Sequence, residues 1–265
     1  MGQIDRTGKL YRPLGLVLTA IVVPLLGLSG CDRKAEDAPL EPALAGDAQY
    51  LAGPELLEAL GGNGQVHRLR GQAGAVERIR VKDSSGNTYG VTSGAQGQFE
   101  VLVPPQPVPR LFELARQVGT RLIRSEGLLF LPPEGGPAVI LRYGAPSMPV
   151  GPVVLPIAAF DYDNSGSAAI AGAVAPRSEV TVLIDGREAG RTLSDARGVY
   201  ALSLSVPVAT GTRRIRIVSA GEAFERDVRI LPSDEFFVAA EAGGWRVRWP
   251  LPGGNGGGQT TLILR

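Results

Sequence analysis

The sequence contains very little cysteine and histidine: Cys31 is its only cysteine and His67 its only histidine. A single cysteine excludes a disulfide within the chain. Zinc sites of the usual type need several cysteine or histidine ligands, and a catalytic triad of the familiar kind needs a histidine beside its nucleophile. None of these sites is therefore expected, and we expect His67 to be an ordinary surface or strand residue.

The sequence also lacks an excess of charge of one sign. It has 27 basic and 26 acidic residues, for a net charge of +1. Proteins that bind nucleic acids usually carry a marked basic excess, so no nucleic-acid partner is expected. The acidic residues form no distinctive pair of the kind that hydrolyses glycosides. We expect no catalytic residues and no cofactor.

Long apolar runs are missing except for one, from Leu14 to Leu28. This run is shorter than the ~20 residues of a membrane-spanning helix, and Pro24 interrupts it. Basic residues precede it, as in a secretory signal peptide. We therefore assign residues 1–30 to a signal peptide. The following stretch, residues 31–50, is polar and rich in alanine and proline, which is typical of a flexible tether.

The end of the apolar run, Leu28-Ser29-Gly30-Cys31, resembles the lipobox of bacterial lipoproteins. The resemblance implies cleavage before Cys31 and attachment of lipid to that residue. Several acyl chains on one residue would anchor a protein firmly to a membrane. It further implies a location in the bacterial cell envelope, facing the periplasm. Asp32 resembles an inner-membrane retention signal of enteric bacteria, and the choice between inner and outer membrane stays open.

Glycine and proline are abundant, at 36 and 21 residues, which suits many turns between short strands. Apolar residues alternate with polar ones in stretches such as Phe99–Val103 and Tyr200–Val206. This period of two predicts half-buried strands and an all-β fold.

An internal repeat organises most of the chain. Residues 71–103 align with residues 172–204 at an offset of 101, so that Gly97 matches Gly198 and Phe99 matches Tyr200. A repeat of this length is too long for a solenoid unit and is close to the size of one β-sandwich domain.

The second unit has a pattern of ten turn and core residues that resembles bacterial Ig-like modules and carboxypeptidase regulatory-like domains. They are Gly172, Val180, Val182, Asp185, Gly186, Thr192, Asp195, Gly198, Tyr200 and Leu202. In the first unit Gly94 replaces the aspartate and Phe99 the tyrosine. The resemblance implies two tandem Ig-like β-sandwich domains that are accessory modules without a catalytic centre.

We expect the first domain over residues 51–143, with a short leading helix at Pro54–Leu60. A proline-rich segment at residues 144–156 follows, which could equally be a linker or a strand. The second domain then covers residues 157–265. Its C-terminal stretch, from Gly243, predicts a hairpin with Trp245, Val247 and Trp249 on one face and Arg246 and Arg248 on the other.

Two groups of residues are candidates for binding. Tryptophans stack on sugars and arginines bind anions, so Trp245, Trp249, Arg246 and Arg248 could contact a glycan or a protein partner. Asp161, Asp163 and Ser165 resemble the start of a calcium-binding loop, although Gly172 stands where an EF-hand needs its glutamate. A polar turn is the favoured interpretation of this second group, and no metal is expected.

The sequence thus predicts a non-catalytic, membrane-anchored envelope lipoprotein that acts as a scaffold or docking module for an envelope protein assembly. The alternative hypothesis is a module that binds peptidoglycan or another polysaccharide.

Overall fold

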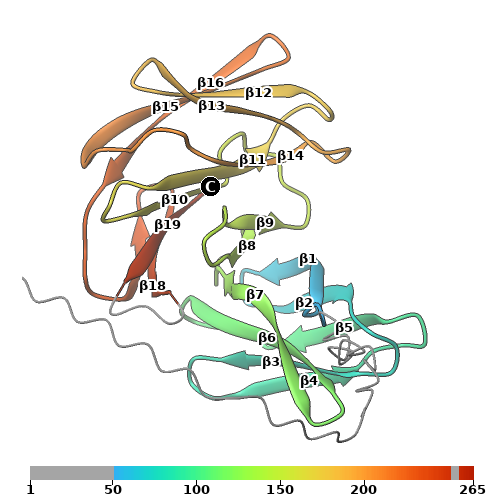
Figure 1. The fold of residues 1–265 in the computed structure, drawn as a ribbon. Helices are drawn as coiled ribbons and strands as arrows, with labels where there is room; N and C mark the ends of the chain where they lie inside the picture. Colours follow the sequence, from blue (N-terminus) through green and yellow to red (C-terminus); the bar gives the residue numbers. More distant parts are fainter. Residues whose placement is uncertain (1–50, 252–256) are drawn as a thin grey trace, which may run out of the picture. The chain divides into compact units, whose positions relative to one another are not determined.

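The computed structural model describes residues 51–251 and 257–265, and within these ranges the chain is all-β and antiparallel (Figure 1). The predicted fold class is therefore confirmed. Among the described residues there is no helix of the length and apolar character needed to cross a membrane.

The first sandwich packs two sheets, ordered β1-β2-β5 and β4-β3-β6-β7-β8-β9, against each other. Its core includes Leu69, Ile79, Val81 and Phe112, all fully buried. On β3, Ile79 and Val81 face this core while their neighbours face outward, as the period of two predicts. The strands are β1 (Glu55–Gly62), β2 (Gln65–Gln72), β3 (Arg78–Asp83), β4 (Thr88–Thr92), β5 (Gln98–Val103), β6 (Arg110–Val118), β7 (Arg121–Leu131), β8 (Ala138–Leu141) and β9 (Met148–Val150).

The second sandwich packs sheets ordered β13-β12-β15-β16 and β14-β11-β10-β19-β18-β17. Phe160, Tyr162 and Tyr200 are among the largest side chains in its core. The strands are β10 (Ala159–Asp163), β11 (Ala168–Ala173), β12 (Glu179–Ile184), β13 (Arg187–Leu193), β14 (Val199–Ser203), β15 (Gly211–Ser219), β16 (Glu222–Ile230), β17 (Phe237–Glu241), β18 (Gly244–Pro250) and β19 (Gly258–Leu264).

The internal repeat appears in the structure as two copies of one strand topology, in which β1–β7 correspond to β10–β16. Pairing registers keep the offset of 101: Ala59 lies opposite Leu69, and Phe160 opposite Ile170. Hydrogen bonds in the loops show the same offset of 101 residues. The Ala73 N–H donates to the Gly97 carbonyl at 2.9 Å, and the Val174 N–H donates to the Gly198 carbonyl at the same distance.

The same aspartate–glycine turn occurs at three of the connections between consecutive strands. Asp83, Asp163 and Asp195 each accept backbone N–H bonds from the residues two and four positions later. A glycine three positions after each aspartate has a positive φ of 85–93°. This is a type I turn closed by a left-handed residue, which suits glycine because it has no Cβ.

The leading helix predicted over Pro54–Leu60 is wrong, because these residues lead into and form strand β1. The sequence ELLEAL has helical spacing, but Ala59 and Leu60 pair with β2 instead. Pairing with a neighbouring strand outweighs the weak local preference for helix. Within the proline-rich segment, Met148–Val150 forms β9 and pairs with β8.

The two sandwiches differ at one edge. In the second sandwich, β10 pairs with β19, and β18 and β17 follow outward in the same sheet. In the first sandwich, β1 is the counterpart of β10 but ends its sheet, and the extra strands β8 and β9 join the opposite sheet beside β7. The space beside β1 is therefore bordered by β8 and β9 rather than filled by a strand of its own sheet.

Gly198 offers a test of the turn geometry. A Cβ on Gly198 would lie 2.2 Å from the Val174 carbonyl oxygen, and its φ is +85°. We expect Gly198→Ala to lower the free energy of unfolding by about 2–4 kcal/mol, from backbone strain and this clash together. Gly186→Ala is the control, because Gly186 has a φ of +79° but no atom within 4 Å of its Cβ position. It should cost about 1 kcal/mol. If urea unfolding gave equal losses of unfolding free energy for the two variants, the predicted clash at Gly198 would be contradicted.

Candidate functional site

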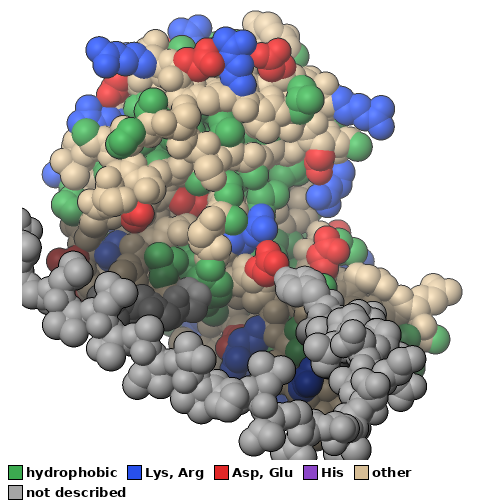
Figure 2. Space-filling view, viewed as in Figure 1, with side chains coloured by type: hydrophobic (Ala, Val, Ile, Leu, Met, Phe, Trp, Pro, Cys, Tyr) green, Lys and Arg blue, Asp and Glu red, His purple; other side chains and the backbone are tan. Residues whose placement is uncertain are grey.

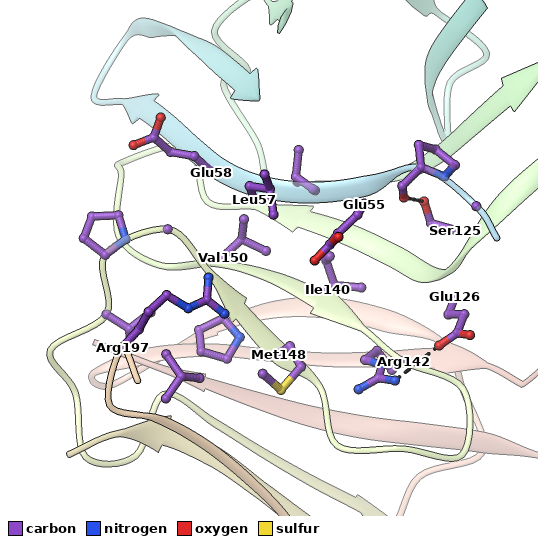
Figure 3. A pocket seen from close by; sticks show the side chains of 18 of the residues that line it. Glu55, Leu57, Glu58, Ser125, Glu126, Ile140, Arg142, Met148, Val150 and Arg197 are labelled. Atoms are coloured by element: carbon purple, nitrogen blue, oxygen red, sulfur yellow. Dashed lines mark hydrogen bonds and ion pairs between the residues drawn. The ribbon is translucent and has the colours of Figure 1, made fainter. Parts of the chain in front are cut away.

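A groove of about 770 Å³ lies beside β1. Figure 3 shows β1 along one side and the β8–β9 segment along the other. Arg197 in the turn before β14 and Val199 at the start of β14 also line the groove, so both sandwiches contribute to it. Its volume lies within the range of pockets that hold small ligands or short peptides.

The groove follows an open stretch of the β1 edge between two closed ends. At one end a Cβ on Gly53 would lie 2.3 Å from the Arg124 carbonyl oxygen, so β1 begins tightly against β7. At the other end Gly151 lies against Ala59, with 3.7 Å from its Cβ position to the Ala59 N and O atoms. Between these ends, Glu55–Glu58 borders the groove. An edge strand presents unpaired backbone N–H and C=O groups.

The start of β1 is also held by side chains from the opposite sheet. The Arg116 guanidinium donates to the Ala52 carbonyl at 2.7 Å and forms an ion pair with Glu77 at 2.6 Å. The Ser125 hydroxyl donates to the Pro54 carbonyl at 2.9 Å. These bonds fix the position of the strand that forms one wall of the groove.

The groove is lined by both apolar and charged side chains. Leu57, Ile140, Met148 and Val150 come from both sides (Figure 3), and Leu57 is 46% exposed. Glu55 also lines the groove, and three further charged side chains form ion pairs: Glu58 with Arg70 at 3.3 Å, Arg142 with Glu126 at 3.2 Å, and Arg197 with Asp195 at 3.2 Å. Such a site favours an occupant that presents both apolar and polar side chains.

Of the two tryptophans that the sequence offered as a binding face, the structure buries Trp249 fully and Trp245 partly. Trp249 is fully buried, and Trp245 packs on the same cluster with Phe130, Val139 and Leu141 of β7 and β8. Tyr143 lies over Trp249 with ring centroids 5.1 Å apart. The expected glycan or partner contact through Trp249 is corrected on this ground, whereas a contact through the partly buried Trp245 stays a prediction.

Arg246 and Arg248 are on the other face of β18, as expected, but they too are buried, with 3% of each residue exposed. Arg246 bonds to Glu241, to the Tyr162 hydroxyl and to the Arg229 carbonyl. Arg248 donates to the Gly258 carbonyl at 3.1 Å. A buried guanidinium that is bonded inside the fold is not available to an external anion, so this part of the expectation is also corrected.

The residues suggested for calcium have separate structural roles. Asp161 is buried and accepts hydrogen bonds from the Ser147 N–H at 2.6 Å, the Ser147 hydroxyl at 2.7 Å and the Thr261 hydroxyl at 2.5 Å. Asp163 accepts from the Ser165 backbone and hydroxyl in the turn described above. Across residues 51–251 and 257–265, no three acidic, histidine or cysteine side chains form a group that could hold a metal ion.

His67 is a buried residue of strand β2, with 3% exposed, and burial lowers the pKa of its imidazole. It lies opposite Val103. Cys31 lies outside the described residues, so its predicted lipid attachment stays a prediction.

Sequence reasoning missed the groove. Its β1 wall was assigned to a helix, and its opposite wall lies in the segment left open between linker and strand. The internal repeat could have predicted strand β1. At an offset of 101, Glu58 and Ala59 correspond to Ala159 and Phe160, which belong to a strand.

No model of a known protein family matches the chain, and a search of curated proteins finds no match. Among solved structures, the chain is similar to one described as "Biofilm associated protein - BSP domain", with a TM-score of 0.24 and 16% identity. The likeness covers 68% of this chain and 29% of that chain. At this TM-score the likeness carries no argument, and the function is inferred from the chain's own geometry.

Asp161 and Asp163 form a matched pair for a stability test. In Asp161→Asn an amide N–H group replaces a carboxylate oxygen that faces only donors, so we expect a loss of about 1–3 kcal/mol in the free energy of unfolding. In Asp163→Asn the turn keeps an acceptor oxygen at an exposed site, and the loss should stay within about 0.5 kcal/mol. Similar losses in the two variants would contradict the assigned roles.

Asp161 also predicts a dependence of stability on pH. Burial raises the pKa of Asp161 above its ordinary value of 3.8, despite its hydrogen bonds. The native state therefore holds this proton more tightly than the unfolded state. The contribution of Asp161 to stability should be greatest below pH 3.8 and fall as the pH rises toward the native pKa. We expect the wild type to lose stability relative to Asp161→Asn over this window, and the opposite slope would contradict it.

Proposed function

We propose that this chain is a non-catalytic docking module of the bacterial cell envelope, anchored in a membrane through lipid on Cys31 and facing the periplasm. Its groove receives a short extended segment of an envelope protein. The segment lies antiparallel to β1 beside Glu55–Glu58 and adds a strand to the edge of the sheet. This mode of binding combines backbone hydrogen bonds, which give affinity, with side-chain pockets, which give specificity.

The observation that carries the docking role is the difference between β1 and β10. β10 pairs with β19 over Ala159–Asp163, whose counterparts on β1 are Glu58–Gly62, whereas β1 ends its sheet and borders the open groove along the adjoining residues Glu55–Glu58. The side chains of β19 alternate between two apolar clusters, with Leu262 and Leu264 on one side and Ile263 on the other. An occupant with the same alternation would match the apolar groove walls.

The anchoring role is supported by the sequence around Cys31, in which a basic start, an apolar run, small residues and a cysteine follow in order. Tethered residues at a membrane surface meet their partners at a raised effective concentration. A groove that covers only a few residues of its partner is suited to that situation, since each short contact by itself is weak. The full burial of Trp249 favours this proposal over a glycan-binding alternative, which would depend on the partly buried Trp245 alone.

The anchor can be tested with Cys31→Ser expressed in a bacterium that processes lipoproteins. We expect the wild type to pellet with membranes and the variant to move to the soluble fraction, because the acyl chains supply the membrane affinity. Mass spectrometry of the amino-terminal peptide should find acyl groups on Cys31 in the wild type. Equal membrane recovery of both proteins, with an unmodified Cys31, would contradict lipid anchoring.

The groove can be tested by placing a photo-crosslinking amino acid at position 57 in living cells. Leu57 faces the groove and is 46% exposed, and Val66, which is 47% exposed and does not line the groove, is the matched control. We expect position 57 to crosslink to an extended segment of one envelope protein, identified by sequencing the joined peptides, and position 66 to give no such product.

A second substitution shows whether the crosslink reports binding in the groove. Met148→Arg places a charge in the opposite wall and should abolish the crosslink from position 57 while leaving membrane attachment unchanged. The same products from positions 57 and 66, or a crosslink that persists in Met148→Arg, would contradict docking in the groove.

A further inference from the structure

A row of three basic residues lies on the outer face of the first sandwich. Arg78, Arg80 and Lys82 alternate on β3 with Ile79 and Val81, which are fully buried in the core. Side chains two residues apart on a strand share one face and are spaced by about 6.7 Å. The three cations therefore form a straight row along β3.

A shallow trough of about 440 Å³ lies beside this row. The opposing strand β4 contributes Thr88, Gly90 and Thr92, all exposed and paired across from Lys82, Arg80 and Arg78 respectively. Gly90 has no side chain, so the trough is open beside Arg80. The two threonine hydroxyls lie on either side of that opening, where each can donate or accept a hydrogen bond.

The positive charge of the row is not balanced by ion pairs. Among the described residues, Arg78, Arg80 and Lys82 take part in no salt bridge, whereas Arg110 and Arg116 on the adjoining strand β6 both do. Glu113 lies across from Lys82, but its carboxylate bonds to Arg124 at 2.8 Å. Arg80 donates to Gln117 at 3.2 Å, which leaves most of its N–H donors available.

The internal repeat shows that the fold does not require these cations. At an offset of 101, their counterparts on β12 are Glu179, Thr181 and Leu183. The outer face of the second sandwich is instead balanced by cross-strand pairs, Arg214 with Asp227 at 3.1 Å and Arg216 with Glu225 at 3.2 Å. Figure 2 shows basic and acidic side chains interleaved along that part of the surface.

We propose that this trough binds a linear anionic polymer of the envelope, with its carboxylate or phosphate groups along β3. Arginine forms strong, charge-assisted bonds to both groups, and a straight row of cations beside a narrow trough fits a chain better than a flat bilayer. The trough contains no aromatic ring on which a nucleobase could stack. This site is separate from the β1 groove, and its test does not depend on docking there.

The test uses the full chain with two polymers, polygalacturonate for carboxylate and polyphosphate for phosphate, at about 50 mM salt. The triple variant Arg78→Glu, Arg80→Thr and Lys82→Leu introduces the residues that the second sandwich has at these positions, so it is compatible with the strand. Arg191→Glu, Arg214→Thr and Arg216→Leu is the control, because it makes the same change in net charge on the second sandwich.

We expect at least a tenfold loss of affinity for one or both polymers in the first variant and less than a twofold loss in the control. The salt dependence of binding should weaken in the first variant only, since fewer cations contact the polymer. A third variant, Arg78→Gln, Arg80→Gln and Lys82→Gln, replaces the three cations with neutral polar side chains and should lose polymer affinity as the first variant does. Its unfolding curve shows whether the lost binding is due to lost folding.

The comparison of the two polymers identifies the anionic group, and preference for either one supports the site. Absence of binding by the wild type would overturn the proposal, as would equal losses in the two charge-matched variants. Tighter binding to vesicles of anionic lipid than to either polymer, lost in the first variant, would also overturn it in favour of a membrane surface.

Discussion

The structure depends on the buried contact between the C-terminal hairpin of the second sandwich and strands β7 and β8 of the first. Trp249 is fully buried there, and its indole N–H donates to the Thr261 hydroxyl at 3.2 Å. That hydroxyl donates in turn to Asp161, which also receives two bonds from Ser147. Because an apolar cluster surrounds a satisfied polar network, the two sandwiches have a specific relative position, as buried networks often provide.

This contact gives the groove its geometry. Ser147 immediately precedes β9, so bonding Ser147 to Asp161 fixes the segment that forms the groove wall opposite β1. Arg197, which lines the groove from the second sandwich, is placed by the same contact. The residues that looked most like a binding face in the sequence therefore support the groove from a distance and do not line it.

Much of the fold could be predicted because it depends on local chemistry. Alternating residues on β3, β5 and β12 predicted their strands, and the aspartate–glycine spacing of the turns predicted where the strands reverse. The helix at Pro54–Leu60 failed because the spacing of its leucines fits both structures, and only the pairing with β2 decides between them. The hairpin faces were predicted correctly, but their burial was not, because a sequence pattern does not show what covers a face.

The hydrogen bonds at the start of β1 have a mechanical consequence. If the chain is held at Cys31, any pull on the body of the protein enters the described structure at Leu51. The first bonds to carry that load are those from Arg116 to the Ala52 carbonyl and from Ser125 to the Pro54 carbonyl. Both donors belong to the sheet opposite β1, so tension is shared between the two layers before it reaches the β1–β2 ladder. An edge strand that would otherwise peel away one pair at a time is thereby clamped at the end where the force arrives.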